Sequence, residues 1–149
     1  MLHKYMRLSN SHGLTDALIE FGKTHRFNDE YFQTINDQSF SGLLYVLTAG
    51  IHVPNPSELL SSDTFKEYMK VLKQNFDFII IDCAPIGSIS DAIPVGNAVD
   101  GTIFVVSAKD TKRKDAAQCV DLLKRSNVNV IGSVLTKADS GSGSYHYYY

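Results

Sequence analysis

Hydrophobic residues along this chain fall into two patterns, consecutive apolar runs and apolar positions spaced three or four residues apart. The runs cover residues 43–48, 78–81, 102–106 and 130–135, and the run at 78–81 is apolar throughout. Runs of this kind suit strands that are covered on both faces in a parallel sheet, rather than strands with one wet face. A shorter stretch, residues 30–35, is compatible with a small edge strand.

The helical pattern is clearest after Thr64, where the apolar residues recur at i, i+3, i+4 and i+7. These residues are Phe65, Tyr68, Met69 and Leu72. Further helices are expected from Gly13 to Gly22, after the Asn55-Pro56 start signal, through Val95 and from about Thr111. Strands alternating with helices predict an α/β fold, a parallel sheet with helices on both faces and right-handed crossovers.

Asp82 directly follows the run at residues 78–81. A carboxylate cannot enter such a sheet without a large desolvation cost, so we expect it at the carboxyl edge, where open α/β sheets bind ligands. This is the Walker B arrangement, in which Asp82 is a metal ligand that holds Mg²⁺ on nucleotide phosphates. The alternative is that Asp82 only caps the turn containing Pro85 and Gly87.

Length and charge narrow the class of protein. The 149 residues suit one domain, and a net charge of −2 predicts no nucleic-acid partner and no polybasic membrane patch. No apolar stretch approaches the roughly 20 residues of a membrane span, and no signal peptide is recognisable at Met1. We therefore expect a cytoplasmic chain with no direct membrane span. The cysteines are expected to be reduced, and the scattered histidines indicate no zinc site.

The last ten residues differ in composition from the rest. Residues 140–144 alternate serine and glycine, which is typical of a flexible linker. Four tyrosines follow it: Tyr145, Tyr147, Tyr148 and Tyr149. We therefore divide the chain into a folded part, residues 1–139, and a linker with a tyrosine-rich tail, residues 140–149. Two interpretations of this tail are open: the tyrosines have a functional role, or they are an incidental aromatic end.

Three short motifs invite a phosphate or nucleotide interpretation. Gly22-Lys23-Thr24 resembles the end of a P-loop but follows a helix and has Ala17 at the first glycine position. Cys119 and Arg125 have the spacing of a cysteine-dependent phosphatase, but the residues between them are helical and lack glycine. Thr136-Lys137-Ala138-Asp139 follows the last strand and resembles a base-reading motif, so Thr136 and Lys137 are candidate nucleotide-binding residues.

Several blocks together resemble the bacterial tyrosine autokinases of capsule and exopolysaccharide synthesis, over nearly the whole chain. The blocks are residues 13–18, 55–60, 79–85 and 100–106, followed by the tyrosine tail. The resemblance implies a P-loop ATPase fold related to partitioning ATPases, using ATP and Mg²⁺ to phosphorylate a C-terminal tyrosine cluster. It also implies a membrane-spanning chain-length regulator as partner, contact with other kinase copies, and a location at the inner face of the membrane.

By this resemblance, Asp82 matches the Walker B aspartate and acts in catalysis, and the four tail tyrosines match the phosphate acceptors. Cys83 and Ala84 depart from the family, which has Thr or Ser followed by Pro there. The family's P-loop lysine and second Walker motif belong upstream of Leu2, so we expect an incomplete P-loop fold lacking its first strands. The chain alone is then expected to be inactive, with apolar surface exposed on its strands.

Two other functions remain open. The chain could be a non-catalytic phosphate acceptor or docking partner of an intact kinase, which suits a tyrosine tail without a phosphate cradle. It could also be a relative of the partitioning ATPases, although such a protein has no use for the tyrosines.

Overall fold

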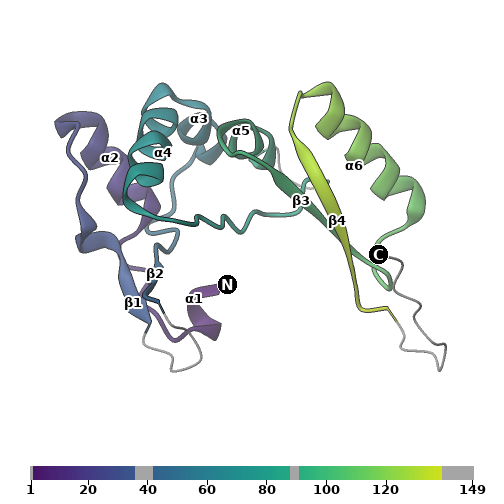
Figure 1. The fold of residues 1–149 in the computed structure, drawn as a ribbon, viewed down its shortest axis with the longest axis horizontal. Coiled ribbons are helices and arrows are strands. Elements are labelled where there is room, and N and C mark those ends of the chain that lie inside the picture. Colours follow the sequence, from purple (N-terminus) through teal and green to yellow (C-terminus); the bar gives the residue numbers. More distant parts are fainter. Residues whose placement is uncertain (1, 36–41, 88–90, 139–149) are drawn as a thin grey trace. The chain divides into compact units, whose positions relative to one another are not determined.

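The computed structural model describes residues 2–35, 42–87 and 91–138 and places the chain in two compact units (Figure 1). The first unit is Met1–Asp82 and the second is Cys83–Tyr149. The elements of the first unit are α1 (Leu2–Tyr5), α2 (Leu14–Thr24), the 3₁₀ turn η1 (Asp29–Tyr31), β1 (Gln33–Ile35), β2 (Leu44–Val46), α3 (Pro56–Ser61) and α4 (Asp63–Asn75). Those of the second are α5 (Ala92–Ala98), β3 (Thr102–Ser107), α6 (Arg113–Arg125) and β4 (Val130–Thr136).

The first unit has an aromatic core built on α2 and α4. The predicted apolar face of α4 is confirmed, since the four residues at helical spacing are all buried. Phe21 of α2 meets Tyr68 of α4 edge to face, with ring centroids 5.2 Å apart. Ser62 caps α4 by accepting a hydrogen bond from the Phe65 N–H at 3.2 Å. The core therefore forms between two helices that are separated along the chain by η1, β1, β2 and α3.

The start of α2 is tied to the loop after β2. The Leu14 N–H donates to the Thr48 carbonyl at 2.7 Å, and the Gly13 N–H donates to the Asp16 carboxylate at 2.9 Å. Gly50 has a φ of +82°, and a Cβ there would lie 2.5 Å from Asp16 Oδ2. The backbones pass too closely at this point for any residue but glycine.

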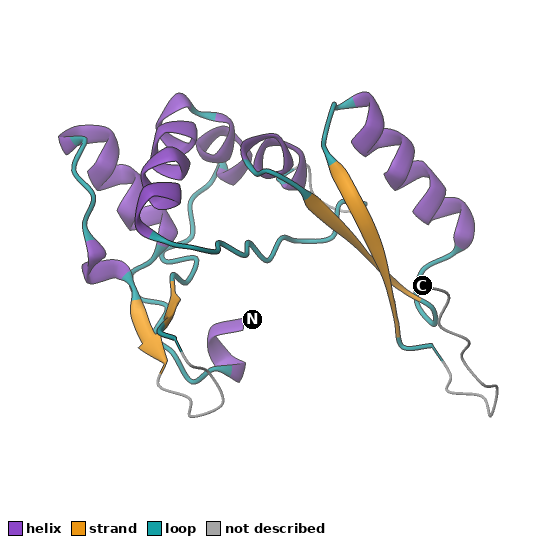
Figure 2. Cartoon of the chain, viewed as in Figure 1, coloured by secondary structure: helices purple, strands orange, loops and turns teal. Residues whose placement is uncertain are grey.

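The predicted strand at residues 43–48 exists only in part and is not parallel. It is the short β2, which pairs antiparallel with β1, Thr34 lying opposite Tyr45 (Figure 2). β1 confirms part of the predicted edge strand at residues 30–35. β1 ends at Ile35 and β2 begins at Leu44, a separation too short for the crossover that a parallel pair requires.

The second unit contains the parallel pair β3 and β4, joined by α6 as a crossover (Figure 2). Phe104 lies opposite Ser133, and Val105 opposite Val134. The predicted strands at residues 102–106 and 130–135 are thus confirmed, as is the α/β class. Of the predicted apolar face of α6, only Leu123 is buried.

The predicted buried strand at residues 78–81 is wrong in this structure. These residues form no strand, and the side chains of Phe78 and Ile80 are 91% and 95% exposed. The apolar pattern that indicated a covered strand is present, but a strand needs hydrogen-bonding neighbours on its edges. Within the described residues no other strand pairs with this segment. The exposed apolar surface expected from the sequence is therefore observed.

Candidate functional site

Asp82 is the last residue of the first unit, and its side chain is exposed. It follows an unpaired segment instead of a strand, so its predicted position at the carboxyl edge of a sheet is not observed. Since Thr136 and Lys137 belong to the other unit, the structure defines no joint site for the three residues.

The carboxyl ends of β3 and β4 do bring polar groups together. Because the two strands are parallel, the residues that follow them emerge at the same edge of the pair. Lys137 Nζ contacts Asp110 Oδ2 at 2.5 Å, and Ser107 Oγ lies 2.8 Å from the same oxygen. The Thr136 hydroxyl donates to the Val106 carbonyl at 3.2 Å.

The Lys137 ammonium beside Asp110 holds the pKa of that carboxyl below its usual range, and the Ser107 hydroxyl adds to the effect. Both charged side chains are more than half exposed, so solvent screens the ion pair. The Lys137 ammonium pairs with the Asp110 carboxylate here. Such an ion pair orders a loop and does not hold phosphate. Sequence reasoning missed Asp110 and Ser107, although both lie at the end of a predicted strand, where ligand-binding residues are expected.

The described residues do not fit a complete ATP and Mg²⁺ site. In residues 2–35, 42–87 and 91–138, no three His, Cys, Asp or Glu side chains gather where they could share a metal ion. Asp82 alone is one oxygen donor group, whereas magnesium in phosphate-transfer sites is held jointly by carboxylates, phosphates and water. Thr136 and Lys137 could border a bound base, but they supply no cradle for its phosphates.

Two of the short motifs are excluded as predicted. Lys23 and Thr24 lie in the last turn of α2, where the Thr24 hydroxyl donates to the Glu20 carbonyl at 3.0 Å. Cys119 and Arg125 lie within α6, so the intervening amides belong to a helix and not to a phosphate-binding loop. The four tail tyrosines and Asp139 lie outside the described residues.

A second polar cluster, not predicted, joins α2 to η1. The Tyr31 hydroxyl donates to Glu20 Oε2 at 2.5 Å, and Asn28 Nδ2 donates to the same carboxylate at 3.3 Å. The hydrogen bond to Glu20 raises the pKa of Tyr31 to about 12, and burial raises the pKa of Tyr68 to about 12. Both phenols are therefore protonated at neutral pH. The contacts of Glu20 are part-buried and tie α2 to η1 within the first unit, which indicates a structural role.

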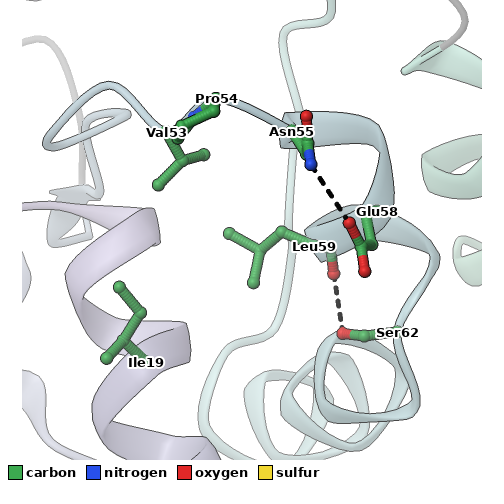
Figure 3. A pocket seen from close by; sticks show the side chains of 7 residues that line it. All are labelled: Ile19, Val53, Pro54, Asn55, Glu58, Leu59 and Ser62. Atoms are coloured by element: carbon green, nitrogen blue, oxygen red, sulfur yellow. Dashed lines mark hydrogen bonds between the residues drawn. The ribbon is translucent and has the colours of Figure 1, made fainter.

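A shallow hollow of about 390 Å³ lies between α2 and α3 (Figure 3). Its lining residues are Ile19, Val53, Pro54, Asn55, Glu58, Leu59 and Ser62. Asn55 Nδ2 donates to Glu58 Oε2 at 3.4 Å and the Ser62 hydroxyl donates to the Leu59 carbonyl at 2.7 Å, so these polar groups are engaged with one another. With Glu58 as its one ionisable group, the hollow offers neither a nucleophile nor a cationic phosphate contact.

No helix in the described part of the chain is both long and apolar enough to cross a bilayer.

No family model matches the chain. Individual relatives do match it over nearly all of its length. It is 33% identical over 147 residues to the putative tyrosine-protein kinase CapB of Staphylococcus aureus, covering 99% of this chain and 61% of CapB. It is 32% identical over 148 residues to the tyrosine-protein kinase YwqD of Bacillus subtilis, covering 99% of this chain and 59% of YwqD.

A solved structure gives the same result. The kinase domain of the Escherichia coli tyrosine kinase ETK superimposes with a TM-score of 0.77 and 28% identity, covering 99% of this chain and 55% of that domain's chain. The chain thus spans about three fifths of the length of the curated relatives it matches. Over the part that it shares with them, this chain is related in sequence and in fold to the bacterial tyrosine-protein kinases.

Proposed function

We propose that this chain forms part of an ATP-dependent protein-tyrosine kinase of capsule or exopolysaccharide synthesis. The observation that carries the proposal is the match to CapB across 99% of the chain, joined to the TM-score of 0.77 against a kinase domain. In the complete kinase, Asp82 supplies a magnesium-binding carboxylate, and Thr136 and Lys137 border the nucleotide base. Tyr145, Tyr147, Tyr148 and Tyr149 accept the phosphate.

On its own the chain transfers no phosphate. Phosphoryl transfer depends on positioning the phosphates and neutralising their charge, which requires an N–H cradle and a cation on the β- and γ-phosphates. Among the described residues, Asp82 is a lone exposed carboxylate, and Lys137 contacts Asp110 instead. The complete kinase acts at the inner face of the membrane with a membrane-spanning chain-length regulator, as the resemblance implies.

A second function is a phosphate acceptor that serves an intact kinase. It is favoured by the combination of four tyrosines on a Gly/Ser linker with described residues that do not fit an ATP site. In this role Asp82 is dispensable, since the catalytic groups come from the other protein.

One experiment separates the two functions and tests both. The purified chain is incubated with ATP and Mg²⁺, first alone and then with Bacillus subtilis YwqD, and phosphotyrosines are mapped by mass spectrometry. We expect no phosphate on the chain alone and phosphate on residues 145–149 when YwqD is present. Phosphorylation of the chain alone would contradict the proposal that it lacks catalytic groups.

The matched controls are Asp82→Asn and a variant with Phe at all four tail tyrosines. If the chain is an acceptor, Asp82→Asn is phosphorylated by YwqD as well as the original chain, and the Phe variant is not. If the tail stays unmodified in every mixture, the acceptor function is wrong.

A further inference from the structure

A cluster of cationic side chains follows β3, in the loop to α6 and the first turn of that helix. It consists of Lys109, Lys112, Arg113 and Lys114, and we call it the basic segment. In the described part of the chain, none of the ion pairs involves the last three of these side chains. Asp110 and Asp115 are the carboxylates of this stretch, and Asp110 is already paired with Lys137. The basic segment therefore carries an excess of positive charge.

The stability of α6 does not account for the position of these charges. The dipole of a helix favours carboxylates in its first turn and cations in its last turn. Lys124 and Arg125 in the last turn of α6 follow this rule, whereas Arg113 and Lys114 in the first turn oppose it. An anionic group from another part of the protein would reverse that disadvantage.

The tyrosine tail of the chain begins beside the basic segment. β3 and β4 are parallel, with Ser107 opposite Thr136, so the residues that follow the two strands leave the pair at the same edge. The contact between Lys137 and Asp110 at 2.5 Å joins the two exits. Both strands belong to the second unit, so this neighbourhood follows from the strand register within that unit.

The tail is long enough to bring its tyrosines to these cations. Tyr145 lies eight residues beyond Lys137, a stretch that can extend to about 28 Å. Lys114 lies four residues beyond Asp110 and is thus within about 14 Å of it. A phosphorylated tyrosine carries a charge of about −1.5 to −2 and three acceptor oxygens, which pair with Arg and Lys. An unmodified tyrosine offers these cations no charge.

We propose that the basic segment is the docking site of the chain's own tail after the tail tyrosines are phosphorylated. Arg113, with Lys112 and Lys114, holds phosphotyrosine through charge-assisted hydrogen bonds, and the unmodified tail is not held there. The inference rests on the proposed function, in which the tail accepts phosphate, and adds a regulatory contact to it. A tail bound in this way is withdrawn from the catalytic groups of other kinase copies.

The test uses the full 149-residue chain and fluorescein-labelled synthetic peptides of residues 140–149. One peptide is unmodified, and the other carries phosphate on all four tyrosines. Fluorescence anisotropy measures the dissociation constant of each peptide at low and at physiological salt. We expect the phosphopeptide to bind at least about tenfold more tightly than the unmodified peptide, and its affinity to fall as salt screens the ion pairs. Equal binding of the two peptides would overturn the proposal.

A double variant at each end of α6 locates the contact. Arg113→Gln with Lys114→Gln removes two cations from the basic segment and should weaken phosphopeptide binding at least about fivefold. Lys124→Gln with Arg125→Gln removes the same two kinds of cation from the last turn and should change binding less than about twofold. Urea unfolding checks the fold, and the first variant should be no less stable than the original chain because it removes cations from a helix N-terminus.

Occupancy by the chain's own tail is measured in a semisynthetic chain. Its last ten residues are the phosphopeptide, joined to the rest by chemical ligation. We expect this chain to bind the free labelled phosphopeptide at least about tenfold more weakly than the unmodified chain, because its own tail already occupies the basic segment at a high effective concentration. Equal binding by the two chains would show that the tail does not reach its own basic segment.

The proposal is also overturned if both double variants weaken binding equally, or if the chain binds phosphatidylglycerol vesicles through the basic segment but does not bind the phosphopeptide. The second result would identify a membrane contact. Because the phosphate is introduced by synthesis, none of these results depends on a kinase that phosphorylates the chain. Docking can therefore fail while phosphotyrosine mapping supports the proposed function, and the reverse.

Discussion

The helical core of the first unit and the strand pair of the second unit use their apolar residues in opposite ways. In the first unit, α4 buries Phe65 and Tyr68 almost completely against neighbouring elements. In the second, β3 carries equally apolar residues, yet Ile103 and Val105 remain more than half exposed. Helices satisfy their backbone hydrogen bonds internally and need only a packed face, whereas strands also need lateral neighbours. The comparison separates a packed helical core from strands whose apolar side chains remain exposed.

The largest expected contrast is between Phe65→Ala and Val105→Ala. Phe65 is 1% exposed, so its truncation leaves a cavity and should lower the free energy of unfolding by about 3–5 kcal/mol. Val105 is 60% exposed, so its truncation should change that free energy by less than about 0.5 kcal/mol. Urea unfolding followed by circular dichroism measures both. Equal losses would show that Val105 is covered in solution.

Two glycines extend the comparison to the backbone. Gly50→Ala places a Cβ 2.5 Å from Asp16 Oδ2 at a φ of +82° and should destabilise the chain by about 2 kcal/mol. Gly132→Ala is the matched control on β4, because a Cβ there meets nothing within 4 Å. It should be neutral or slightly stabilising, since glycine weakens a strand. A strong loss of stability at Gly132 would contradict the free space beside this residue.

Asp16 gives a smaller effect with a defined pH dependence. Burial pushes its pKa up, but hydrogen bonds from the Gly13 N–H, the His12 side chain and the Ile51 backbone together bring the pKa below its ordinary value of 3.8. The charged form is thus favoured in the folded state. Its stabilisation is complete above pH 3.8 and is lost as the pH falls through the lower folded value.

Asp16→Ala should accordingly lower the free energy of unfolding by about 1 kcal/mol at pH 7. The difference between the variant and the original chain should shrink below pH 3.8, as measured by urea unfolding across pH. A difference that grows on acidification has the wrong sign for this account.

The smallest expected effect is at the ion pair of Lys137 and Asp110. Both side chains are more than 60% exposed, so solvent and salt screen the attraction. Lys137→Ala should leave the urea midpoint within experimental error at 0.15 M salt. A clear loss would indicate that this pair orders the strand ends more strongly than its exposure suggests.

The sequence predicts the local elements of this protein better than its sheet. Patterns that span only a few residues predict these elements: the buried face of α4, the start of α3 at Pro56, and the strands β3 and β4. The direction of β2 was missed, since strand pairing is decided by long-range contacts. Residues 78–81 have the composition of a covered strand but no strand partner among the described residues.

The sequence likewise predicted only some residues of the candidate site. Lys137 was identified from a motif at the end of a strand, but its partner Asp110 follows a different strand and becomes its neighbour only through the parallel pairing. Asp82 was identified from the run before it, and its environment depends on neighbours that this unit does not supply.

The most direct test is hydrogen exchange of the 149-residue chain by itself. Amides of α4 are expected to exchange slowly, because that helix is packed in a core of its own, while amides at residues 78–81 should exchange at close to the rates of an unfolded peptide. If residues 78–81 are protected as strongly as α4, the contrast between a packed helical core and apolar segments without strand neighbours is wrong.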